Sequence, residues 1–208
     1  MVKIKHGKPI KCHYCRRDAV FKCASCGRLL CGKHAQLRTT CPECTKKTKL
    51  KYTIGRATSH EERKDIGEFV RAFWGEEEQL TFDRKFMVTK LPAFIARFKD
   101  NPIGFISTAD SDDAVIIVAL GILPEFQSLG VGKDLVKNVE DEAVQGKKKR
   151  LLVSTSNDDL PALAFYQSLG FQIYEVKPNA IAEKHGKTLM GIGNLPIRDE
   201  LRMQKKLG

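Results

Sequence analysis

The chain has 208 residues, of which 42% are hydrophobic and 29% charged, and its formal net charge is +11. These values are typical of a globular protein and exclude a wholly disordered chain, and no apolar run reaches the ~18 residues that a membrane span requires. Residues 1–5 have no apolar stretch, unlike a secretory signal. We therefore expect a cytoplasmic protein without a membrane partner, in a reducing compartment where clustered cysteines favour metal binding over disulfides.

The positive charge is concentrated in the first quarter of the chain. Residues 1–56 hold 15 Lys and Arg against two acidic residues, a net charge of +13, whereas the remainder holds 21 basic and 23 acidic residues, a net charge of −2. All seven cysteines also lie in this first quarter. A Lys- and Thr-rich stretch at residues 45–49 marks a boundary. We predict a small N-terminal domain of residues 1–48 and a larger domain of residues 49–208.

Cysteine and histidine residues in the N-terminal domain are spaced as ligands for two Zn²⁺ ions. They form four pairs with two intervening residues each, and two such pairs complete one tetrahedral site. A domain of about 50 residues buries too little apolar surface to fold unaided, so metal would supply the missing stability. The eight predicted ligands are Cys12, Cys15, Cys23, Cys26, Cys31, His34, Cys41 and Cys44.

The order of these pairs resembles the B-box and related cross-braced zinc domains, over residues 12–44 only. The resemblance implies that the first pair shares an ion with the third and the second with the fourth, although B-boxes usually carry histidines where this chain has Cys41 and Cys44. Sequential pairing is the alternative. B-box-like modules usually bind proteins, and a closed four-ligand site leaves no open position for catalysis. Seven thiolates and two Zn²⁺ lower the charge of the domain to about +10, which still suits RNA, DNA or an acidic protein.

Residues 49–208 alternate between strand and helix patterns, which predicts a mixed α/β domain with a central sheet flanked by helices. Ala114–Leu123 is almost entirely apolar, as in a central buried strand. Gly75 and Gly170 end two of the helices. We expect Trp74 in the core and Glu76–Glu78 in a solvated loop. The predicted strands are 51–57, 93–98, 103–108, 114–123, 151–155, 171–176 and 201–206, and the predicted helices are 61–74, 131–145 and 161–168.

A glycine-containing turn, Gln127-Ser128-Leu129-Gly130-Val131-Gly132-Lys133, joins the apolar strand to the next helix. Backbone N–H groups at such a helix start, together with the helix dipole, form an anion site suited to a pyrophosphate. Gly130 and Gly132 allow the main chain to approach phosphates without a Cβ clash. No Ser or Thr follows the lysine, which excludes a P-loop. Leu135 stands where a Rossmann loop needs its third glycine.

The pattern Gln127-x-x-Gly130-x-Gly132 after an apolar strand resembles the acetyl-CoA loop of the GNAT acetyltransferases. A second family signature at residues 157–171, and the order of strands and helices across residues 50–208, also fit. The resemblance implies a GNAT fold and an N-acetyltransferase that uses acetyl-CoA. It also implies the cofactor contacts: the turn Gln127, Ser128, Leu129, Gly130, Val131, Gly132 and Lys133 at the pyrophosphate, the main chain of Leu120, Gly121, Ile122 and Leu123 along the pantetheine and acetyl group, and Asn157 or Asp159 from the other side.

Tyr166 is the catalytic residue that the resemblance implies. As general acid it would protonate the departing thiolate, because a phenol of pKa ~10 suits donation to a thiol of pKa ~8.5. The alternative is an aromatic side chain that only packs on the sheet. N-terminal ribosomal-protein acetylases carry a glutamate on the fifth strand where this chain has Ser154, so the sequence assigns no general base.

These patterns predict an N-acetyltransferase whose zinc module selects a protein or ribonucleoprotein acceptor. A catalytically inactive GNAT-fold adaptor and a nucleic-acid-binding protein, each docking partners through the basic zinc domain, are the alternatives. Few aromatic residues for base stacking accompany the positive charge. Release of thiol from acetyl-CoA in the presence of amines separates the enzyme from the adaptor, and salt-dependent affinity for RNA or DNA tests the third hypothesis.

Overall fold

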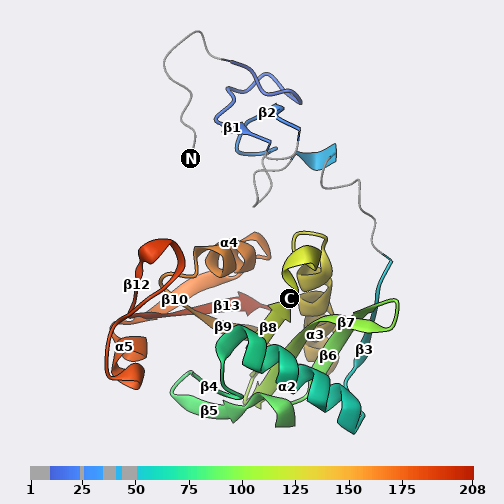
Figure 1. Cartoon of the computed structure of the whole chain (residues 1–208), viewed down its shortest axis with the longest axis vertical. Coiled ribbons are helices and arrows are strands. Elements are labelled where there is room, and N and C mark those ends of the chain that lie inside the picture. Colours follow the sequence, from blue (N-terminus) through green and yellow to red (C-terminus); the bar gives the residue numbers. More distant parts are fainter. Residues whose placement is uncertain (1–9, 24–25, 35–40, 44–50) are drawn as a thin grey trace. The chain divides into compact units, whose positions relative to one another are not determined.

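The computed structural model describes residues 10–23, 26–34, 41–43 and 51–208. The chain forms two compact units, residues 1–51 and Tyr52–Gly208 (Figure 1). The boundary predicted after residue 48 falls in 44–50, outside the described residues. No helix in the described ranges has both the length and the apolar character needed to cross a membrane.

The described part of the first unit has a very small core. Its regular structure is a two-stranded antiparallel ribbon of β1 (Phe21–Lys22) and β2 (Leu29–Leu30). Leu30 is fully buried beside Cys23 and Cys41, with Tyr14 packed against them. Two-residue strands and so few buried side chains supply little hydrophobic stabilisation, so this unit needs another source of stability.

The second unit is built around a seven-stranded mixed sheet (Figure 1). Strands β8 and β9 run parallel, and the other neighbouring strands run antiparallel. The predicted mixed α/β fold is confirmed. In spatial order the strands are β10 (Gln172–Lys177), β13 (Glu200–Lys206), β9 (Arg150–Ser156), β8 (Ala114–Ile122), β7 (Asn101–Ser111), β6 (Ala93–Phe98) and β3 (Thr53–Arg56).

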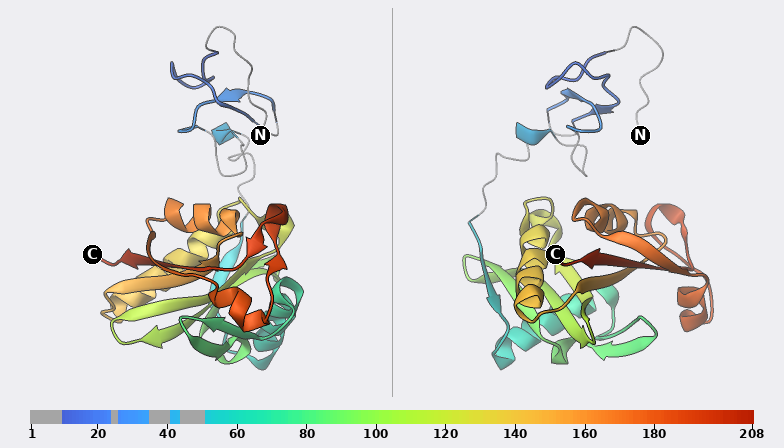
Figure 2. Two further views of the ribbon diagram at one scale, coloured as in Figure 1. Left: turned by 90° about the vertical axis from the view of Figure 1, so that its left-hand side faces the viewer. Right: turned by 180° about the vertical axis from the view of Figure 1, so that it is seen from behind.

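Helices cover both faces of this sheet (Figure 2). A Cβ added at Gly121 would touch the ring of Phe73 in one helix, whereas Ile122 faces Gly132 in another. Successive strand residues point to opposite faces, so these two helices lie on opposite sides. Phe165 also approaches Gly132, which puts a third helix on the second side. The helices are α2 (His60–Trp74) on the first face, α3 (Val131–Gln145) and α4 (Leu160–Ser168) on the second, and the short α5 (Ala180–His185).

A hairpin that the sequence analysis did not predict, β4 (Glu78–Thr81) and β5 (Arg84–Met87), lies on the α2 face of the sheet. Phe86 of the hairpin packs in one cluster with Ala109, whereas Phe69 of α2 packs on Phe105. These two β7 residues are four positions apart and share a face. The remaining short elements are the 3-10 turns η1 (Val88–Lys90), η2 (Pro124–Phe126) and η3 (Ile192–Asn194) and the paired strands β11 (Leu189–Met190) and β12 (Pro196–Ile197).

Two expectations about the end of α2 and the segment after it are wrong. Trp74 is 41% exposed and does not lie in the core. Glu76–Glu78 is not simply a solvated loop, because Glu78 begins β4 and the Glu77 carboxylate accepts a hydrogen bond from the Thr89 hydroxyl at 3.1 Å. The hairpin turn uses Phe82 and Asp83 with positive φ angles of 52° and 58° and contains no glycine, so it carries no strong turn signal.

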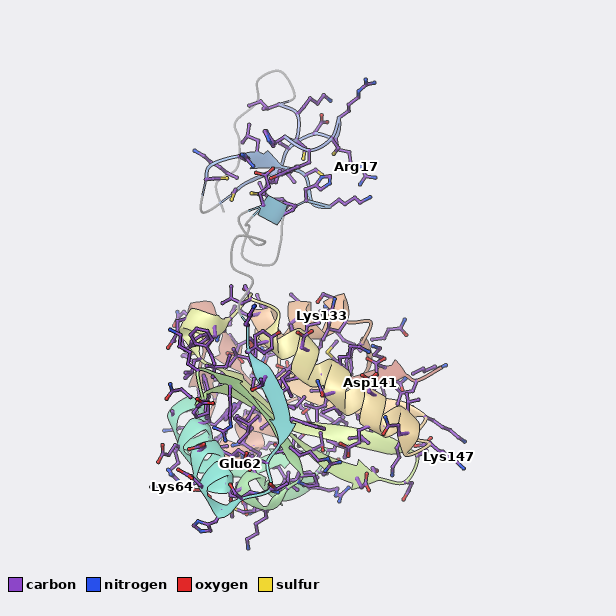
Figure 3. All side chains as sticks on the ribbon, turned by 90° about the vertical axis from the view of Figure 1, so that its right-hand side faces the viewer. Arg17, Glu62, Lys64, Lys133, Asp141 and Lys147 are labelled. Carbon is purple, nitrogen blue, oxygen red and sulfur yellow. The ribbon has the colours of Figure 1, made fainter. Side chains whose placement is uncertain are left out.

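Helix α2 begins with a capping box, which makes its stability depend on pH. The hydroxyl of Ser59 accepts from the Glu62 N–H, and the Glu62 carboxylate accepts from the Ser59 N–H at 2.9 Å. Figure 3 shows Glu62 on α2. The backbone N–H groups of Ser59 and Thr58, with Arg97 beyond them, lower the pKa of Glu62 from 4.5 to about 2. The lowered pKa means that the ionised form stabilises the fold above pH 4.5 and that this contribution disappears as the pH falls toward 2.

We expect Glu62→Ala to lower the free energy of unfolding at pH 7 by about 1 kcal/mol, the usual contribution of a helix cap. Urea denaturation across pH measures this effect, and the difference from the native chain should shrink between pH 4.5 and 2. The exposed Glu68 on the same helix supplies the control Glu68→Ala. An equal loss in both variants, or a loss at Glu62 that does not vary with pH, would contradict the capping role.

Candidate active site and metal centre

The parallel pairing of β8 with β9 stops halfway along both strands. The register begins with Ala114 opposite Arg150 and ends with Ile117 opposite Val153. Beyond this point β8 continues along β7, and β9 continues along β13 to Ser156. The two strands therefore diverge toward their C-terminal ends and open the sheet between them.

A β-bulge marks the point of divergence. Ala119 pairs with Ser107 of β7, and Ile117 pairs with Thr108, the next residue of β7. Val118 is therefore an extra residue on β8, and such a residue bends its strand and increases the local twist. The bulge turns the end of β8 away from β9.

The outer half of β8 presents backbone groups to this opening. The Leu123 N–H donates to the Ile103 carbonyl on β7 at 3.0 Å. In an antiparallel pair the bonded residues alternate, so the N–H groups of Leu120 and Ile122 point away from β7, toward β9. The Ile122 carbonyl points the same way and accepts from the Gln127 side-chain amide at 3.0 Å. The resemblance to the GNAT acetyltransferases implies that the main chain of 120–123 lies along the cofactor, and two of the four N–H groups of this segment face the opening.

A cavity of about 340 Å³ lies at the divergence of the two strands. It is lined by residues 117–120 of β8 and residues 153–156 of β9. Tyr166 of α4 borders it, as do Trp74 at the end of α2 and Glu200 at the start of β13. The β4–β5 hairpin and α5 contribute further lining residues. The volume is that of a small-molecule site.

The turn before α3 has the geometry of an anion site. Ser128 and Gly130 have positive φ angles of 63° and 98°, and Gly130 is the N-cap without a side-chain cap bond. The first intrahelical bond is donated by Asp134 to the Gly130 carbonyl, so the N–H groups of the first helical turn have no partner within the helix. The Val131 side chain is buried beneath the turn, and Lys133 lies at the start of α3 (Figure 3).

Side chains at the two turn glycines would disturb this turn, because Gly130 has a positive φ and Gly132 lies against other side chains. A Cβ at Gly132 would lie 3.4 Å from the Phe165 ring and 3.7 Å from Ile122. We expect Gly130→Val/Gly132→Val to raise the Kd of acetyl-CoA about 100-fold or more, because loss of two charge-assisted hydrogen bonds costs about 3 kcal/mol. Calorimetric titration measures this effect. Gly55, where an added Cβ meets nothing within 4 Å, supplies the control Gly55→Ala. An unchanged Kd in the double variant would remove the phosphate role of the turn.

Tyr166 lies on the α4 side of the opening. Its side chain is only 6% exposed, and its ring packs edge-on against those of Phe165 and Phe171. Burial, together with the nearby carboxylate of Asp159, raises the pKa of Tyr166 above its ordinary value. A phenol in this environment stays protonated near neutral pH, which is the state that a general acid requires.

The two polar residues predicted to reach the cofactor from the opposite side have structural partners. Asn157 accepts from the N–H groups of Arg198 and Asp199 and donates to the Pro196 carbonyl, so it fixes the segment before β13. Asp159 caps α4 by accepting from the Ala162 N–H at 3.0 Å. Burial raises the pKa of Asp159. Of the two, Asp159 also borders the cavity.

Sequence reasoning missed the residues on the α2 side of the cavity. Trp74 and Leu80 are exposed apolar side chains at its border. Lys184 of α5 also borders it and pairs with Glu76 at 3.3 Å. Leu80 and Lys184 come from the hairpin and α5, which lack a clear periodic pattern, and Trp74 ends a predicted helix, so no signal in the sequence brings the three together.

In the first unit, four of the predicted zinc ligands form one cluster. The ligand atoms of Cys12, Cys15, Cys31 and His34 all lie within 4.8 Å of one another. The Cys15 and Cys31 sulfurs are 3.7 Å apart, and His34 Nδ1 is 3.5 Å and 3.4 Å from the Cys12 and Cys31 sulfurs. Tetrahedral zinc with its usual bond lengths requires about 3.8 Å between two sulfurs and about 3.6 Å between sulfur and nitrogen. The cluster fits a zinc ion and joins the first pair to the third.

A second cluster contains Cys23, Cys26 and Cys41. The sulfurs of Cys26 and Cys41 are 3.7 Å apart, again the edge of a zinc tetrahedron. The Cys41 N–H donates to the Cys23 sulfur at 3.2 Å, the kind of bond that orients a thiolate ligand. The fourth predicted ligand, Cys44, lies outside the described residues. Both clusters follow the cross-braced order.

Comparisons with known proteins agree with this geometry. Residues 59–171 match the family model described as "Acetyltransferase (GNAT) family". The uncharacterized protein YxbD of Bacillus subtilis is 28% identical over 147 residues, which cover 68% of this chain and 91% of YxbD. An IAA acetyltransferase from Bacillus cereus superposes with a TM-score of 0.63 at 18% identity, over 76% of this chain and all of that one. A GNAT family acetyltransferase from Elizabethkingia anophelis with acetyl-CoA bound superposes with a TM-score of 0.58 at 18% identity, over 77% of this chain and 100% of that one.

The family match covers more than half of the chain, and the chain therefore belongs to the GNAT acetyltransferase family. The predicted GNAT fold is confirmed, and so is the prediction of an acetyltransferase at the level of the family. The matched residues contain the opening between β8 and β9, the turn before α3 and Tyr166.

Proposed function

We propose that the second unit binds acetyl-CoA across the opening between β8 and β9 and transfers its acetyl group to an amine. The pyrophosphate would rest on the amides of residues 128–133, and the thioester would lie beside Leu120. The observation that carries this proposal is the divergence of β8 and β9 at Val118, because it opens a cavity beside outward-facing N–H groups. Acetyl-CoA itself supplies the activated acyl group.

The residues of the chain would each perform one step of the transfer. A neutral amine attacks the thioester carbonyl, and the Leu120 N–H stabilises the negative charge that develops on the carbonyl oxygen. The carbon–sulfur bond then breaks, and Tyr166 gives its proton to the departing thiolate. Burial and the Asp159 carboxylate raise the pKa of Tyr166, so its hydroxyl carries the proton when the thiolate departs.

The first unit would hold two Zn²⁺ ions and select the acceptor. The fit of two ligand clusters to the edges of a zinc tetrahedron supports the ions. The net charge of residues 1–56, about +10 with two Zn²⁺ bound, supports an acidic or anionic acceptor surface, such as a ribonucleoprotein or an acidic protein. A cytoplasmic location follows from the need for reduced thiolates.

The enzymatic proposal is tested by thiol release from acetyl-CoA in the presence of proteins, ribosomes and small amines, with the products identified by mass spectrometry. We expect turnover with at least one amine, and faster turnover with a macromolecular acceptor when the first unit is intact. Binding of acetyl-CoA without turnover across the whole panel would contradict the transferase and favour the adaptor.

The positive charge of the first unit also supports a second candidate function, direct binding to a nucleic acid. Such binding depends on displaced counterions, so its affinity must fall steeply with salt. Titration of labelled RNA and DNA between about 50 and 200 mM salt measures this. An affinity that does not depend on salt, or no binding, would remove nucleic acid as the partner.

A further inference from the structure

The acceptor side of the cavity contains a chain of hydrogen-bonded side chains from three different elements. Ser154 lies on β9, Glu200 on the neighbouring β13, and Thr81 at the end of β4. In the register of β9 with β13, Ser156 stands opposite Glu200 and Ser154 opposite Arg202. The side chains of Ser154 and Glu200 therefore lie on the face of the sheet that the β4–β5 hairpin covers. Ser154, Glu200 and Thr81 all border the cavity.

The geometry of this chain is continuous. The Thr81 and Ser154 hydroxyl oxygens are 2.6 Å apart, and the Thr81 hydroxyl donates to the Glu200 Oε1 at 3.2 Å. Thr81 and Glu200 are each only 7% exposed. The chain therefore links Ser154, which is partly exposed, to the nearly buried carboxylate of Glu200.

The carboxylate fixes the direction of both hydrogen bonds. An ionised carboxylate only accepts, so the single hydroxyl proton of Thr81 is donated to Glu200. Ser154 must then donate its own proton to Thr81. The Ser154 oxygen therefore has only acceptor capacity left toward the cavity, which suits the N–H of an amine.

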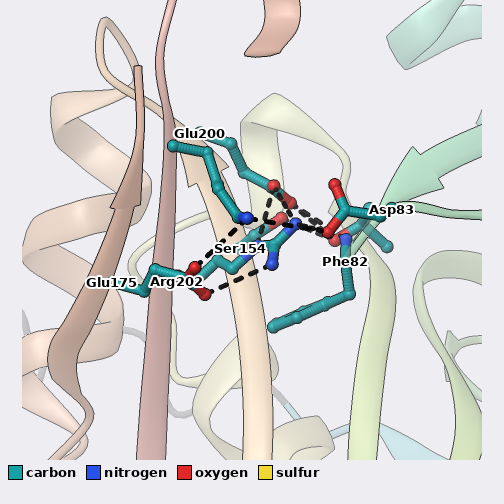
Figure 4. Close-up of polar contacts among 8 residues, drawn as sticks. Phe82, Asp83, Ser154, Glu175, Glu200 and Arg202 are labelled. Carbon is teal, nitrogen blue, oxygen red and sulfur yellow. Dashed lines mark hydrogen bonds and ion pairs between the residues drawn. The ribbon is translucent and has the colours of Figure 1, made fainter.

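Glu200 is held in its place by other donors. Oε1 also accepts from the Phe82 N–H at 3.1 Å, and Oε2 accepts from Arg202 Nε at 2.9 Å (Figure 4). Arg202 in turn pairs with Asp83 at 2.8 Å and Glu175 at 3.2 Å. These contacts occupy the carboxylate on its other sides, so the way for a proton from the cavity leads through Thr81.

We propose that Ser154, Thr81 and Glu200 form a relay that removes the proton from the acceptor amine, an inference that rests on the proposed acetyl transfer. As the new carbon–nitrogen bond forms, the amine proton passes to the Ser154 oxygen. The Ser154 proton passes to Thr81, and the Thr81 proton passes to Glu200 Oε1. Glu200 ends protonated, and both hydroxyls are unchanged. Before the next turnover Glu200 returns its proton to water, and Tyr166 takes up a proton to replace the one it gave to the thiolate.

The relay and Tyr166 approach the opening from opposite faces of the sheet. Ser154 and Glu200 lie on the face of α2 and the hairpin, and Tyr166 comes from α4 on the other face. This arrangement separates the group that takes a proton from the group that gives one. Strand β9 has a serine, Ser154, and no carboxylate at this position. The relay supplies the carboxylate from Glu200 on the neighbouring strand β13.

The pH dependence of the reaction tests the relay. Thr81→Val removes the middle hydroxyl of the relay with little change in side-chain volume, and Ser154→Ala removes the hydroxyl that would accept the amine proton. Thr89→Val is the control, because the Thr89 hydroxyl also donates to a carboxylate, that of Glu77. We expect kcat/KM to fall about 100-fold at pH 7 in both relay variants. Their rate should rise more steeply with pH than that of the native enzyme, because a base from solution must then take the amine proton that the relay no longer accepts. Thr81→Ser should restore both rate and profile.

The other charged groups around the relay are kept in all of these variants, and calorimetric Kd values for acetyl-CoA should be unchanged. They are Arg202, Asp83, Glu175, Lys177, Asp159, Tyr166, Lys184 and His185. If the native chain turns over and the relay variants keep its rate, or lose rate without a change of pH profile, the relay is wrong and the transferase stands. If the native chain turns over no amine, the proposed function itself fails.

Discussion

Tyr166→Phe should lower kcat about 10²- to 10⁴-fold, the range that a positioned general acid contributes. The change removes one hydroxyl and keeps the ring between Phe165 and Phe171, so the packing of α4 is preserved. The Kd of acetyl-CoA should remain within about threefold, because the predicted phosphate contacts come from the turn before α3. Single-turnover kinetics and calorimetry measure the two quantities separately.

The matched control for this prediction is Tyr174→Phe, because Tyr174 is exposed on the edge strand β10. Its rate should equal that of the native chain. The raised pKa of Tyr166 adds a second expectation: the native enzyme should not lose activity through ionisation of this acid below about pH 10. Equal turnover in Tyr166→Phe and the native chain would show that Tyr166 only packs against the sheet.

Removal of zinc should unfold the first unit and leave the second unit folded. Structural zinc contributes about 10–16 kcal/mol of apparent binding energy, whereas the described core of this unit contains only a few buried side chains. Elemental analysis should find two zinc ions per chain. After chelation, amide exchange should become fast in the described residues between 10 and 43, and acetylation of a small amine should persist.

Single substitutions distinguish the two zinc sites. Cys31→Ser should remove the zinc of the first cluster and Cys41→Ser that of the second, so each variant should retain one ion. His13 stands outside both ligand groups, and His13→Ala is therefore the control. Two zinc ions in every variant, or an intact first unit after complete chelation, would contradict the structural role of the metal.

The elements with a clear periodic pattern could be predicted from the sequence. Helix α3 spans Val131–Gln145 as expected, because its apolar residues follow the helical repeat after a glycine turn. The strand β8 could also be placed, because a short unbroken apolar run is typical of a central strand that is buried on both faces. The turn between them could be recognised from its resemblance to the GNAT acetyl-CoA loop, and its contact with the pyrophosphate stays a prediction.

The acceptor side could not be predicted, because it depends on contacts distant in sequence. Thr81 and Glu200 are 119 positions apart and meet only because an unpredicted hairpin packs over β9 and β13. The bulge at Val118 leaves no mark in an apolar run, although it starts the divergence of the two strands. The partners of Asn157 are backbone groups of residues 196–199, which no pattern of side chains encodes.

The most direct test of this account is a crystal structure of the protein with bound acetyl-CoA. We predict that the pyrophosphate oxygens accept hydrogen bonds from main-chain N–H groups of residues 128–133, and that the thioester carbonyl accepts from the Leu120 N–H, with the Tyr166 hydroxyl beside the sulfur. A cofactor bound elsewhere, or an opening between β8 and β9 that stays closed to it at saturating concentration, would contradict the account.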